Sequence, residues 1–258
     1  MNPRVPRSAR APAKPARPVL GMLDWGIGGC SVLAALQAQG VDCEVLYASD
    51  SGSLPYGTLT SQALRARVQR VAKALMAQGA EQVVVACNAA STVCAEIPLP
   101  LLSVIDAGVQ AVQHQGFGCV AVLGGQRTVD SQAYVQALQG VEVIQRVAQP
   151  LSALVEAGQL QGALVRSAVA KVIEGLPQVD AVVLACTHYP ALAAHFDALL
   201  PGVPLVDPGV ALAQRLSEGM APGTTRVRFC TSGDPAGMQA AALAAFGVEI
   251  PSLESLLW

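Results

Sequence analysis

Two similar apolar runs, at residues 83–91 and 182–190, constrain the fold of this 258-residue chain more than any other feature. They read VVVACNAAS and VVLACTHYP, so each contains Ala-Cys followed by a polar residue. A short unbroken apolar run is typical of a buried strand in a parallel sheet. Open α/β sheets bind ligands at the carboxyl ends of their strands, which is where Cys87 and Cys186 fall. Both cysteines are therefore candidate site residues.

Strand and helix patterns alternate along the rest of the chain. We predict strands at 19–24, 44–48, 82–86, 101–104, 119–123, 141–145, 180–185, 203–206 and 226–230. We predict helices at 29–39, 59–78, 89–96, 107–115, 129–138, 150–156, 159–175, 190–199, 208–218 and 234–246. Such alternation is typical of an α/β fold with helices on both faces of a parallel sheet.

The two halves of the chain resemble each other. Residues 19–29 (VLGMLDWGIGG) match residues 119–129 (CVAVLGGQRTV) in pattern, as the two cysteine runs match each other. The duplication predicts two similar Rossmann-like lobes, each a parallel sheet flanked by helices, with the active site in the cleft between them. We expect residues 19–107 plus 208–258 to form the first lobe and residues 108–207 the second.

Composition excludes several classes of protein. Residues 1–18 carry five basic side chains and no acid, which predicts a disordered basic tail. The apolar piece that follows is too short for a secretory signal, whereas an organellar transit peptide stays open. No later stretch reaches transmembrane length, so we expect no membrane association. The remaining 11 basic and 18 acidic residues leave a net charge of −7, which argues against a nucleic-acid partner.

The seven cysteines show no Cys-x-x-Cys or Cys/His metal spacing, so we predict no metal site. An odd number of cysteines in a chain of this size favours a reduced, cytoplasmic compartment. We interpret Cys43, Cys119 and Cys230 as small buried core residues and Cys30 and Cys94 as packing residues on helices.

The turn Asp24–Gly29 is rich in glycine and lies between a predicted strand and a predicted helix. It lacks the G-x-G-x-x-G pattern of dinucleotide sites. We expect its glycines to let backbone N–H groups approach a small anionic ligand. Asp24 itself is either a helix N-cap or a carboxylate that handles a substrate ammonium group, and both interpretations stay open.

Six motifs occur in order along the chain: Asp24–Gly29, Pro55–Gly57, Cys87–Ser91, Thr128–Tyr134, Leu154–Glu156 and Cys186–Pro190. Through them the chain resembles, from about residue 19 to 215, the glutamate racemases of the cofactor-independent aspartate/glutamate racemase superfamily. The resemblance implies two Rossmann-like lobes that close over an amino-acid substrate, without any cofactor. We keep a homodimer as the candidate assembly.

Inversion of an amino-acid α-carbon without a cofactor requires one group to remove a proton and another to deliver one to the opposite face. A thiolate and a thiol can do this, but free thiols have a pKa of about 8.5 and need help to ionise. We predict His188 and Glu156 as helpers of Cys186, and Asp24 as the helper of Cys87. Because these groups interact, their pKa values belong to the coupled set. A structural His188 and a solvated Glu156 are the alternatives.

The resemblance also implies contacts to the substrate. It places the backbone of Tyr56 and Gly57, and the side chain of Thr128, near a distal carboxylate; a plain turn and a helix N-cap are the alternatives. No Arg lies in the core motifs, so we expect hydroxyls, amides and backbone N–H groups to hold a dianionic substrate. The predicted substrate-binding residues are Trp25, Pro55, Tyr56, Gly57, Asn88, Ala89, Thr128 and Thr187.

Three departures from the family pattern bear on the substrate. Trp25 stands where the family usually has Ser, Ala89 where it has Thr, and Gln149 where it has Cys before Pro150. Three functions therefore stay open: a glutamate racemase that supplies D-glutamate for peptidoglycan, a divergent racemase for another amino acid or small acid, and a binding or regulatory homologue with weak turnover.

Overall fold

The structure, a computed structural model, describes residues 17–255. Most of the predicted tail, residues 1–16, lies outside this range, but Arg17 and Pro18 are part of the fold. Arg17 Nε donates to Asp42 Oδ1 at 2.6 Å, and the Pro18 carbonyl accepts from the Glu44 backbone N–H at 2.9 Å. The predicted tail is therefore two residues too long, because these contacts tie residues 17 and 18 to the start of the sheet.

The described chain forms two parallel sheets, with strand orders β10-β9-β2-β1-β3-β4 and β6-β5-β7-β8. The first contains β1 (Val19–Asp24), β2 (Glu44–Ser49), β3 (Gln82–Val85), β4 (Leu101–Ser103), β9 (Arg226–Thr231) and β10 (Leu253–Ser255). The second contains β5 (Cys119–Gly124), β6 (Glu142–Val147), β7 (Ala181–Ala185) and β8 (Leu205–Val206). The orders 2-1-3-4 and 6-5-7-8 are equivalent, which is the duplication that the sequence predicts.

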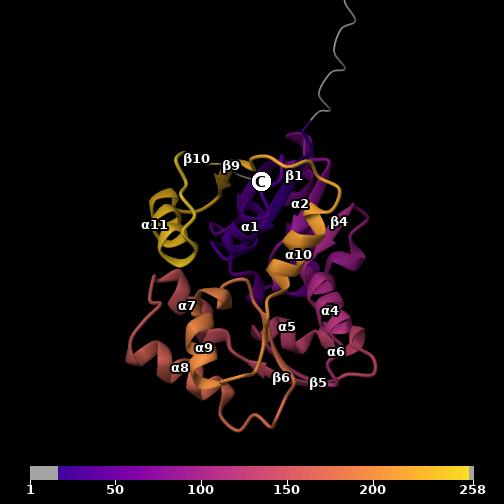
Figure 1. The fold of residues 1–258 in the computed structure, drawn as a ribbon. Helices are drawn as coiled ribbons and strands as arrows, with labels where there is room; N and C mark the ends of the chain where they lie inside the picture. Colours follow the sequence, from indigo (N-terminus) through magenta and orange to yellow (C-terminus); the bar gives the residue numbers. More distant parts are fainter. Residues whose placement is uncertain (1–16, 256–258) are drawn as a thin grey trace, which may run out of the picture.

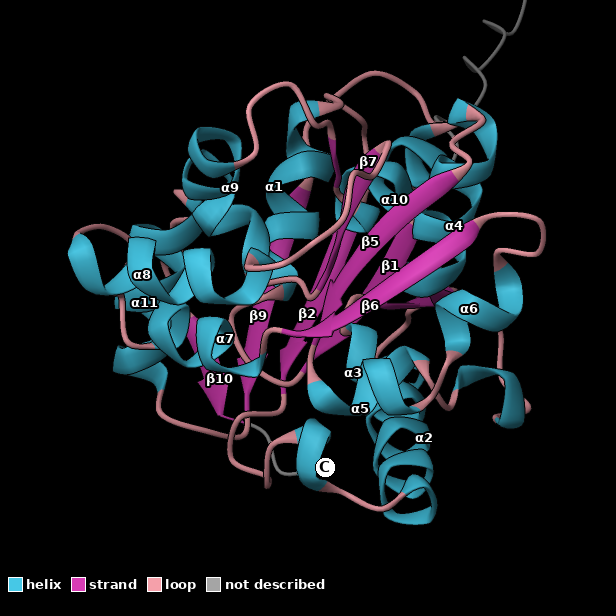
Figure 2. Ribbon diagram, turned by 90° about the horizontal axis from the view of Figure 1, so that it is seen from below, coloured by secondary structure: helices cyan, strands magenta, loops and turns pink. Residues whose placement is uncertain are grey.

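Helices flank both sheets (Figure 2). Those that follow strands of the first sheet are α1 (Gly29–Ala38), α2 (Ser61–Ala77), α3 (Asn88–Ser91), α4 (Val104–Gln115) and α11 (Pro235–Phe246). Those that follow strands of the second sheet are α5 (Gln126–Asp130), α6 (Ala133–Ala137), α7 (Gln149–Glu156), α8 (Ala163–Ile173), α9 (Ala193–Leu199) and α10 (Pro208–Ser217). Short 3₁₀ turns lie at η1 (Tyr56–Thr58), η2 (Cys94–Glu96) and η3 (Tyr189–Leu192).

The two lobes are stacked one above the other in Figure 1. Helix α10 packs against both α1 and α4 and so joins the lobes. Strand β9 pairs with β2, so the chain after residue 226 returns to the first sheet. The predicted α/β fold with two Rossmann-like lobes is confirmed, whereas the exact lobe boundaries at 107 and 207 stay a prediction.

Local differences from the predicted elements have physical causes. The predicted helix at 129–138 is divided into α5 and α6, because Gln132 between them has a left-handed φ of 56° that no α-helix accommodates. The predicted helix at 89–96 is only the short α3 followed by η2. Strand β10 was not predicted, because three residues on a sheet edge are too few to show a pattern.

All seven cysteines are free thiols. Cys30, Cys43 and Cys230 are buried, as predicted for packing residues. Cys119 is only partly buried, so its assignment to the core is wrong: it begins β5, at the exposed end of that strand. Cys94 is also partly buried.

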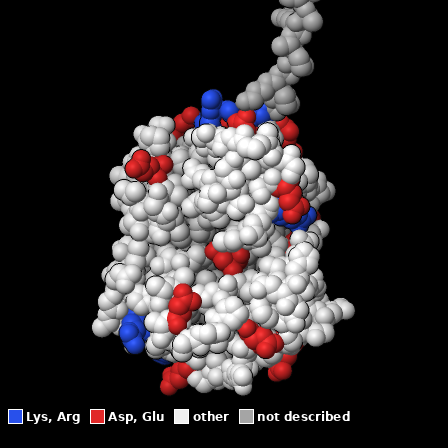
Figure 3. Space-filling model, viewed as in Figure 1, with Lys and Arg blue, Asp and Glu red and all other residues white. Residues whose placement is uncertain are grey.

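Within residues 17–255, no helix combines the length and the apolar character that crossing a membrane requires. The face of the molecule in Figure 3 is mainly uncharged, with acidic and basic side chains scattered over it. This fits a chain in which charged residues make up only 13% of the sequence.

Candidate active site

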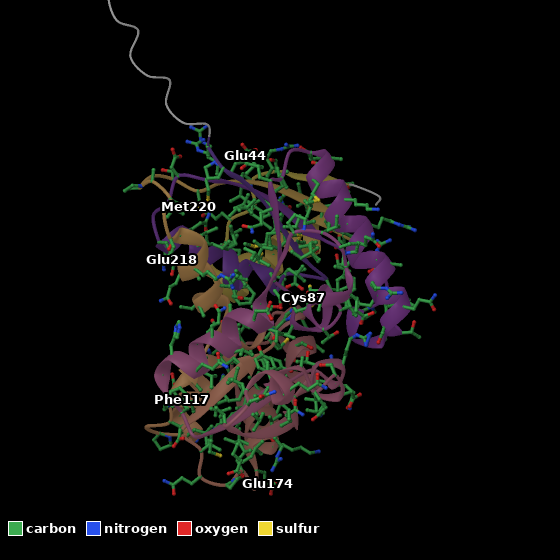
Figure 4. The ribbon with its side chains drawn as sticks, turned by 90° about the vertical axis from the view of Figure 1, so that its right-hand side faces the viewer. Glu44, Cys87, Phe117, Glu174, Glu218 and Met220 are labelled. Atoms are coloured by element: carbon green, nitrogen blue, oxygen red, sulfur yellow. The ribbon has the colours of Figure 1, made fainter. Side chains whose placement is uncertain are left out.

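A pocket of about 500 Å³ lies where the carboxyl ends of the two sheets face each other. Its wall includes residues at the ends of β1, β3, β5 and β7, and Cys87 marks this level between the lobes in Figure 4. All thirteen predicted site residues line the pocket: Asp24, Trp25, Pro55, Tyr56, Gly57, Cys87, Asn88, Ala89, Thr128, Glu156, Cys186, Thr187 and His188. The structure therefore brings together every residue that the sequence nominated, although their chemical roles stay predictions.

Cys186, His188 and Glu156 form a chain of hydrogen-bonding groups on the second lobe. His188 Nδ1 lies 3.6 Å from Cys186 Sγ, and His188 Nε2 lies 2.6 Å from Glu156 Oε1. Burial alone lowers the pKa of His188, but its hydrogen bonds to Cys186 and Glu156 outweigh burial and raise that pKa well above its ordinary value. The contacts with Cys186 and Glu156 therefore favour the protonated imidazole.

The Glu156 carboxylate is correspondingly kept ionised. Burial raises the pKa of Glu156, but the hydrogen bond and the charge of His188 lower it by more. Its Oε1 atom also accepts from the Ile27 backbone N–H at 3.2 Å, a group on the opposite lobe. The alternative of a solvated Glu156 is therefore wrong, because the end of α7 turns this side chain into the cleft.

Cys87 and Asp24 form the matching pair on the first lobe. Both side chains line the pocket, and they interact electrostatically with each other. Burial, and next the negative charge of Asp24, raise the pKa of Cys87 well above its ordinary value. Burial also raises the pKa of Asp24, which the charge of His188 offsets only in part. On this side of the pocket the raised pKa favours the protonated thiol of Cys87, whereas on the opposite side the raised pKa of His188 favours the protonated imidazole.

Asp24 does not cap a helix. Its Oδ1 accepts from the Trp25 backbone N–H at 2.6 Å and its Oδ2 from Thr187 Oγ1 at 3.0 Å, while Gly28 occupies the N-cap position of α1. The N-cap interpretation of Asp24 is wrong, because four residues separate β1 from α1. The carboxylate faces the pocket instead.

The glycines of the Asp24–Gly29 turn serve a close approach between lobes. A Cβ atom at Gly26 would overlap the Glu156 carboxylate, and one at Gly28 would overlap Thr187 Oγ1 and the His188 ring. We expected backbone N–H groups here to approach a small ligand. The Ile27 N–H donates to the carboxylate of Glu156, so at this position of the turn the acceptor belongs to the protein, and the approach of a ligand to the turn stays a prediction.

A buried cluster around Asp50, which sequence reasoning missed, holds the Pro55–Gly57 wall of the pocket. Asp50 follows β2 and accepts hydrogen bonds from Arg67, Tyr56 and Ser232; those from Tyr56 Oη and Ser232 Oγ are both 2.8 Å long. Burial raises the pKa of Asp50, but these hydrogen bonds, led by that of Arg67, lower it further than burial raises it. The signal was available, since Asp50 ends an apolar strand as Asp24 does.

Two further predicted residues lie at the interface of the lobes. Asn88 Oδ1 accepts from Tyr134 Oη at 2.9 Å, whereas the buried Asn88 Nδ2 has no hydrogen-bond partner within residues 17–255. Thr128 is buried inside α5, whose N-cap is Gly125, so its N-cap interpretation is wrong. Both side chains offer polar groups to the pocket.

The three departures from the family pattern also line the pocket. Trp25 is half-buried, and its Nε1–H donates to the Ser53 carbonyl at 3.1 Å, so the indole is attached to the loop that precedes Pro55. Ala89 follows Asn88 in the pocket wall. Gln149 Oε1 accepts from the Gln126 backbone N–H at 3.2 Å.

One lining residue lies outside the predicted motifs. Arg127 lines the pocket, whereas the expectation that hydroxyls, amides and backbone N–H groups hold a dianionic substrate stays a prediction. Arg127 escaped notice because it lies next to the Thr128 motif and not within it. Among the described residues 17–255, no cluster of three or more His, Cys, Asp or Glu side chains is arranged to hold a metal ion.

Comparison with known proteins agrees with this geometry. The profile of the family described as Asp/Glu/hydantoin racemase matches residues 30–216, most of the chain. The chain belongs to this family. It is an amino-acid racemase, as predicted, so the alternative of a homologue that only binds is set aside.

Relatives of this racemase include the glutamate racemase of Limosilactobacillus reuteri, 31% identical over 214 residues that cover 78% of this chain and 80% of the relative. That of Deinococcus radiodurans is 32% identical over 255 residues, 90% of this chain and 88% of the relative. The crystal structure of glutamate racemase from Thermus thermophilus in complex with β-chloro-D-alanine has a TM-score of 0.84 at 29% identity and covers 95% of this chain and 98% of its own.

Proposed function

We propose that this racemase interconverts L- and D-glutamate by proton transfer between two thiols and the substrate Cα. One observation carries the proposal: Cys87 and Cys186 come from different lobes and line one pocket, in which Cys186 contacts His188 and Cys87 interacts electrostatically with Asp24. Relatives that are glutamate racemases support glutamate as the substrate.

The reaction begins with Cys186 as thiolate and Cys87 as thiol. A protonated His188 places a positive charge beside Cys186 Sγ, and a thiolate is the form that this charge attracts. The Cys186 thiolate takes the proton from Cα, and the electron pair of the broken C–H bond passes into the α-carboxylate. Cys87 then gives its proton to the opposite face of Cα. The product has inverted configuration, and the two thiols have exchanged protonation states.

Polar groups of the pocket account for the remaining contacts. Asp24 is the acceptor for the substrate ammonium group, and its raised pKa lets it share a proton with Cys87 after turnover. The unpartnered Asn88 Nδ2 is a donor for the α-carboxylate, since a buried donor without an acceptor is costly. Thr128 and the backbone of Tyr56 and Gly57 face the side-chain carboxylate. No cofactor enters this scheme.

The same proposal includes the cellular role. D-Glutamate made by this chain would supply peptidoglycan synthesis in the cytoplasm. A homodimer remains the proposed assembly.

A second candidate function is racemisation of a different amino acid or small acid. The observation that favours it is that Trp25 and Ala89, which replace the usual Ser and Thr, both line the pocket. They remove two hydroxyl groups and add an indole beside Asp24. The two-thiol chemistry is the same in both candidates.

The test combines Cys87→Ser and Cys186→Ser with assays of both enantiomers in D₂O. Serine keeps the geometry but is a far weaker base, so racemisation falls by orders of magnitude in each variant. Each variant keeps one thiol and exchanges the Cα proton of one enantiomer without inverting it. Cys119→Ser, a partly buried thiol outside the pocket, serves as the control. Racemisation of glutamate at the parent rate by either site variant would exclude the two-thiol mechanism.

A further inference from the structure

Arg127 is a cation in the pocket wall without an anionic partner. It is the only Arg or Lys among the described residues that line the pocket. One of its terminal nitrogens donates to Ser61 Oγ at 3.3 Å, and its buried Nε atom has no hydrogen-bond partner within residues 17–255. No ion pair with a described carboxylate is formed.

An unpaired, half-buried guanidinium is costly to a folded protein. Burial lowers the pKa of Arg127, and nothing in the described chain offsets this effect. Arg usually occurs in such places because its planar fork binds a carboxylate through two parallel hydrogen bonds. The pocket therefore contains a guanidinium group without the carboxylate acceptor that this group usually binds.

The position of Arg127 selects which part of a substrate it meets. Helix α5, which carries Arg127, packs against η1 and so lies beside Tyr56 and Gly57. Asp24 lies at the carboxyl end of β1 in the other lobe, where Thr187 Oγ1 donates to it. A substrate with its ammonium group at Asp24 extends its side chain toward α5.

We propose that Arg127 binds the side-chain carboxylate of an acidic amino acid and thereby sets the preference of this racemase for acidic over neutral substrates. The inference rests on the proposed function and adds to it a specificity-determining residue. The competing explanation is that Arg127 only joins the lobes through Ser61, at the start of α2. The two explanations differ in whether substrate charge matters.

The experiment measures racemisation and Cα deuterium exchange with glutamate and with glutamine, which has the same length but no side-chain charge. Arg127→Gln is expected to raise KM for glutamate by about 10- to 100-fold, the usual effect of losing a hydrogen bond to a charged group, with kcat close to that of the parent. KM for glutamine stays near the parent value. Arg127→Lys keeps the charge but not the fork and gives an intermediate KM.

Ser61→Ala is the matched control, because it removes the contact between lobes and leaves the guanidinium in place. Parent KM values in this variant support the inference. An unchanged KM for glutamate in Arg127→Gln overturns it, and so does an equal rise in KM for glutamine, or a Ser61→Ala variant that behaves like Arg127→Gln. Thermal unfolding and Arg127→Lys show whether a loss in Arg127→Gln is a folding defect.

The parent enzyme separates this inference from the proposed function. If it exchanges the Cα proton of another acidic amino acid and not that of glutamate, the proposed function fails. The inference then stands when Arg127→Gln weakens that substrate. If the parent prefers a neutral amino acid, both fail.

Discussion

Glu156→Gln tests how the protein keeps Cys186 reactive. The substitution preserves the shape of the side chain but removes the charge that His188 Nε2 faces at 2.6 Å. A hydrogen bond to a charged group contributes about 1.5–3 kcal/mol. At 1.4 kcal/mol per factor of ten, the imidazolium–thiolate pair loses about 10- to 150-fold in population against the neutral imidazole–thiol pair.

The expected result is a fall in kcat/KM of up to about 100-fold, because only the thiolate removes the Cα proton. The fall in kcat/KM is equal for the two enantiomers of the substrate. The equilibrium constant between them is one, and this constant fixes the ratio of their kcat/KM values. The pH profile of kcat/KM supplies a second measurement. Because Glu156 helps to raise the pKa of His188, its removal moves the loss of the imidazolium, and the fall in kcat/KM that accompanies this loss, to lower pH.

Glu174→Gln is the control, since Glu174 is exposed at the end of α8, and Figure 4 places it at the far end of the second lobe. It should retain the parent kinetics and the parent pH profile of kcat/KM. The reasoning is refuted if Glu156→Gln keeps both the parent kcat/KM and the parent pH profile. A merely structural role for Glu156 would lower the thermal midpoint without moving the pH dependence.

Three further predictions follow from the site. Trp25→Ser with Ala89→Thr restores two hydroxyl groups and should raise kcat/KM for glutamate by about two- to tenfold for each hydrogen bond regained; no gain in a folded double variant would show that these positions do not set substrate choice. Arg67→Met leaves the buried Asp50 carboxylate without its cation and should lower the free energy of unfolding by about 3 kcal/mol, or Tm by roughly 6–12 °C. The control is Arg65→Met, which breaks an exposed ion pair and should lower the free energy of unfolding by less than about 1 kcal/mol. Since the folded pKa of Asp50 is lowered, this stabilisation is present above its ordinary value of 3.8 and is lost as pH falls below it, so a Tm difference that persists unchanged in strong acid would contradict the assignment. Exhaustive chelation should leave activity intact and alkylation should abolish it unless substrate is bound; activity that a chelator removes and a metal restores would exclude the mechanism.

The residues at strand ends could be predicted because the apolar run of a buried parallel strand stops where the strand ends. Asp24, Cys87 and Cys186 each come directly after an apolar run, and the fold rule for α/β sheets brings such positions together. Asp50, which directly follows β2, could have been found in the same way, but Arg127 could not. Arg127 lies within a short helix, where a basic residue usually indicates a solvated face, and its place in the pocket depends on how α5 packs against η1.

The contact made by the glycine turn could not be predicted from the sequence either, because it also depends on how distant elements pack. Its partner, Glu156, is 129 residues away from Ile27, and no local pattern specifies that contact. The break between α5 and α6 depends on one residue, Gln132. Its backbone is left-handed, a conformation that is unusual for residues other than glycine or asparagine. Periodicity cannot detect such a break, because the apolar spacing continues across it.

The contacts that join the lobes are made by the same residues that the reaction needs. Thr187 donates to Asp24 at 3.0 Å, and the Ile27 N–H donates to Glu156 at 3.2 Å. Any rotation that opens the cleft breaks both hydrogen bonds, at about 0.5–1.5 kcal/mol each. It also frees the Asp24 carboxylate from Thr187. The ammonium group of an entering substrate can then take the place of the Thr187 hydroxyl as the donor to Asp24. Opening of the cleft and capture of the amino acid are thus coupled through Asp24. Thr187→Val, which removes one of these bonds, should raise the rate constant of substrate association, and an unchanged rate constant would contradict the coupling.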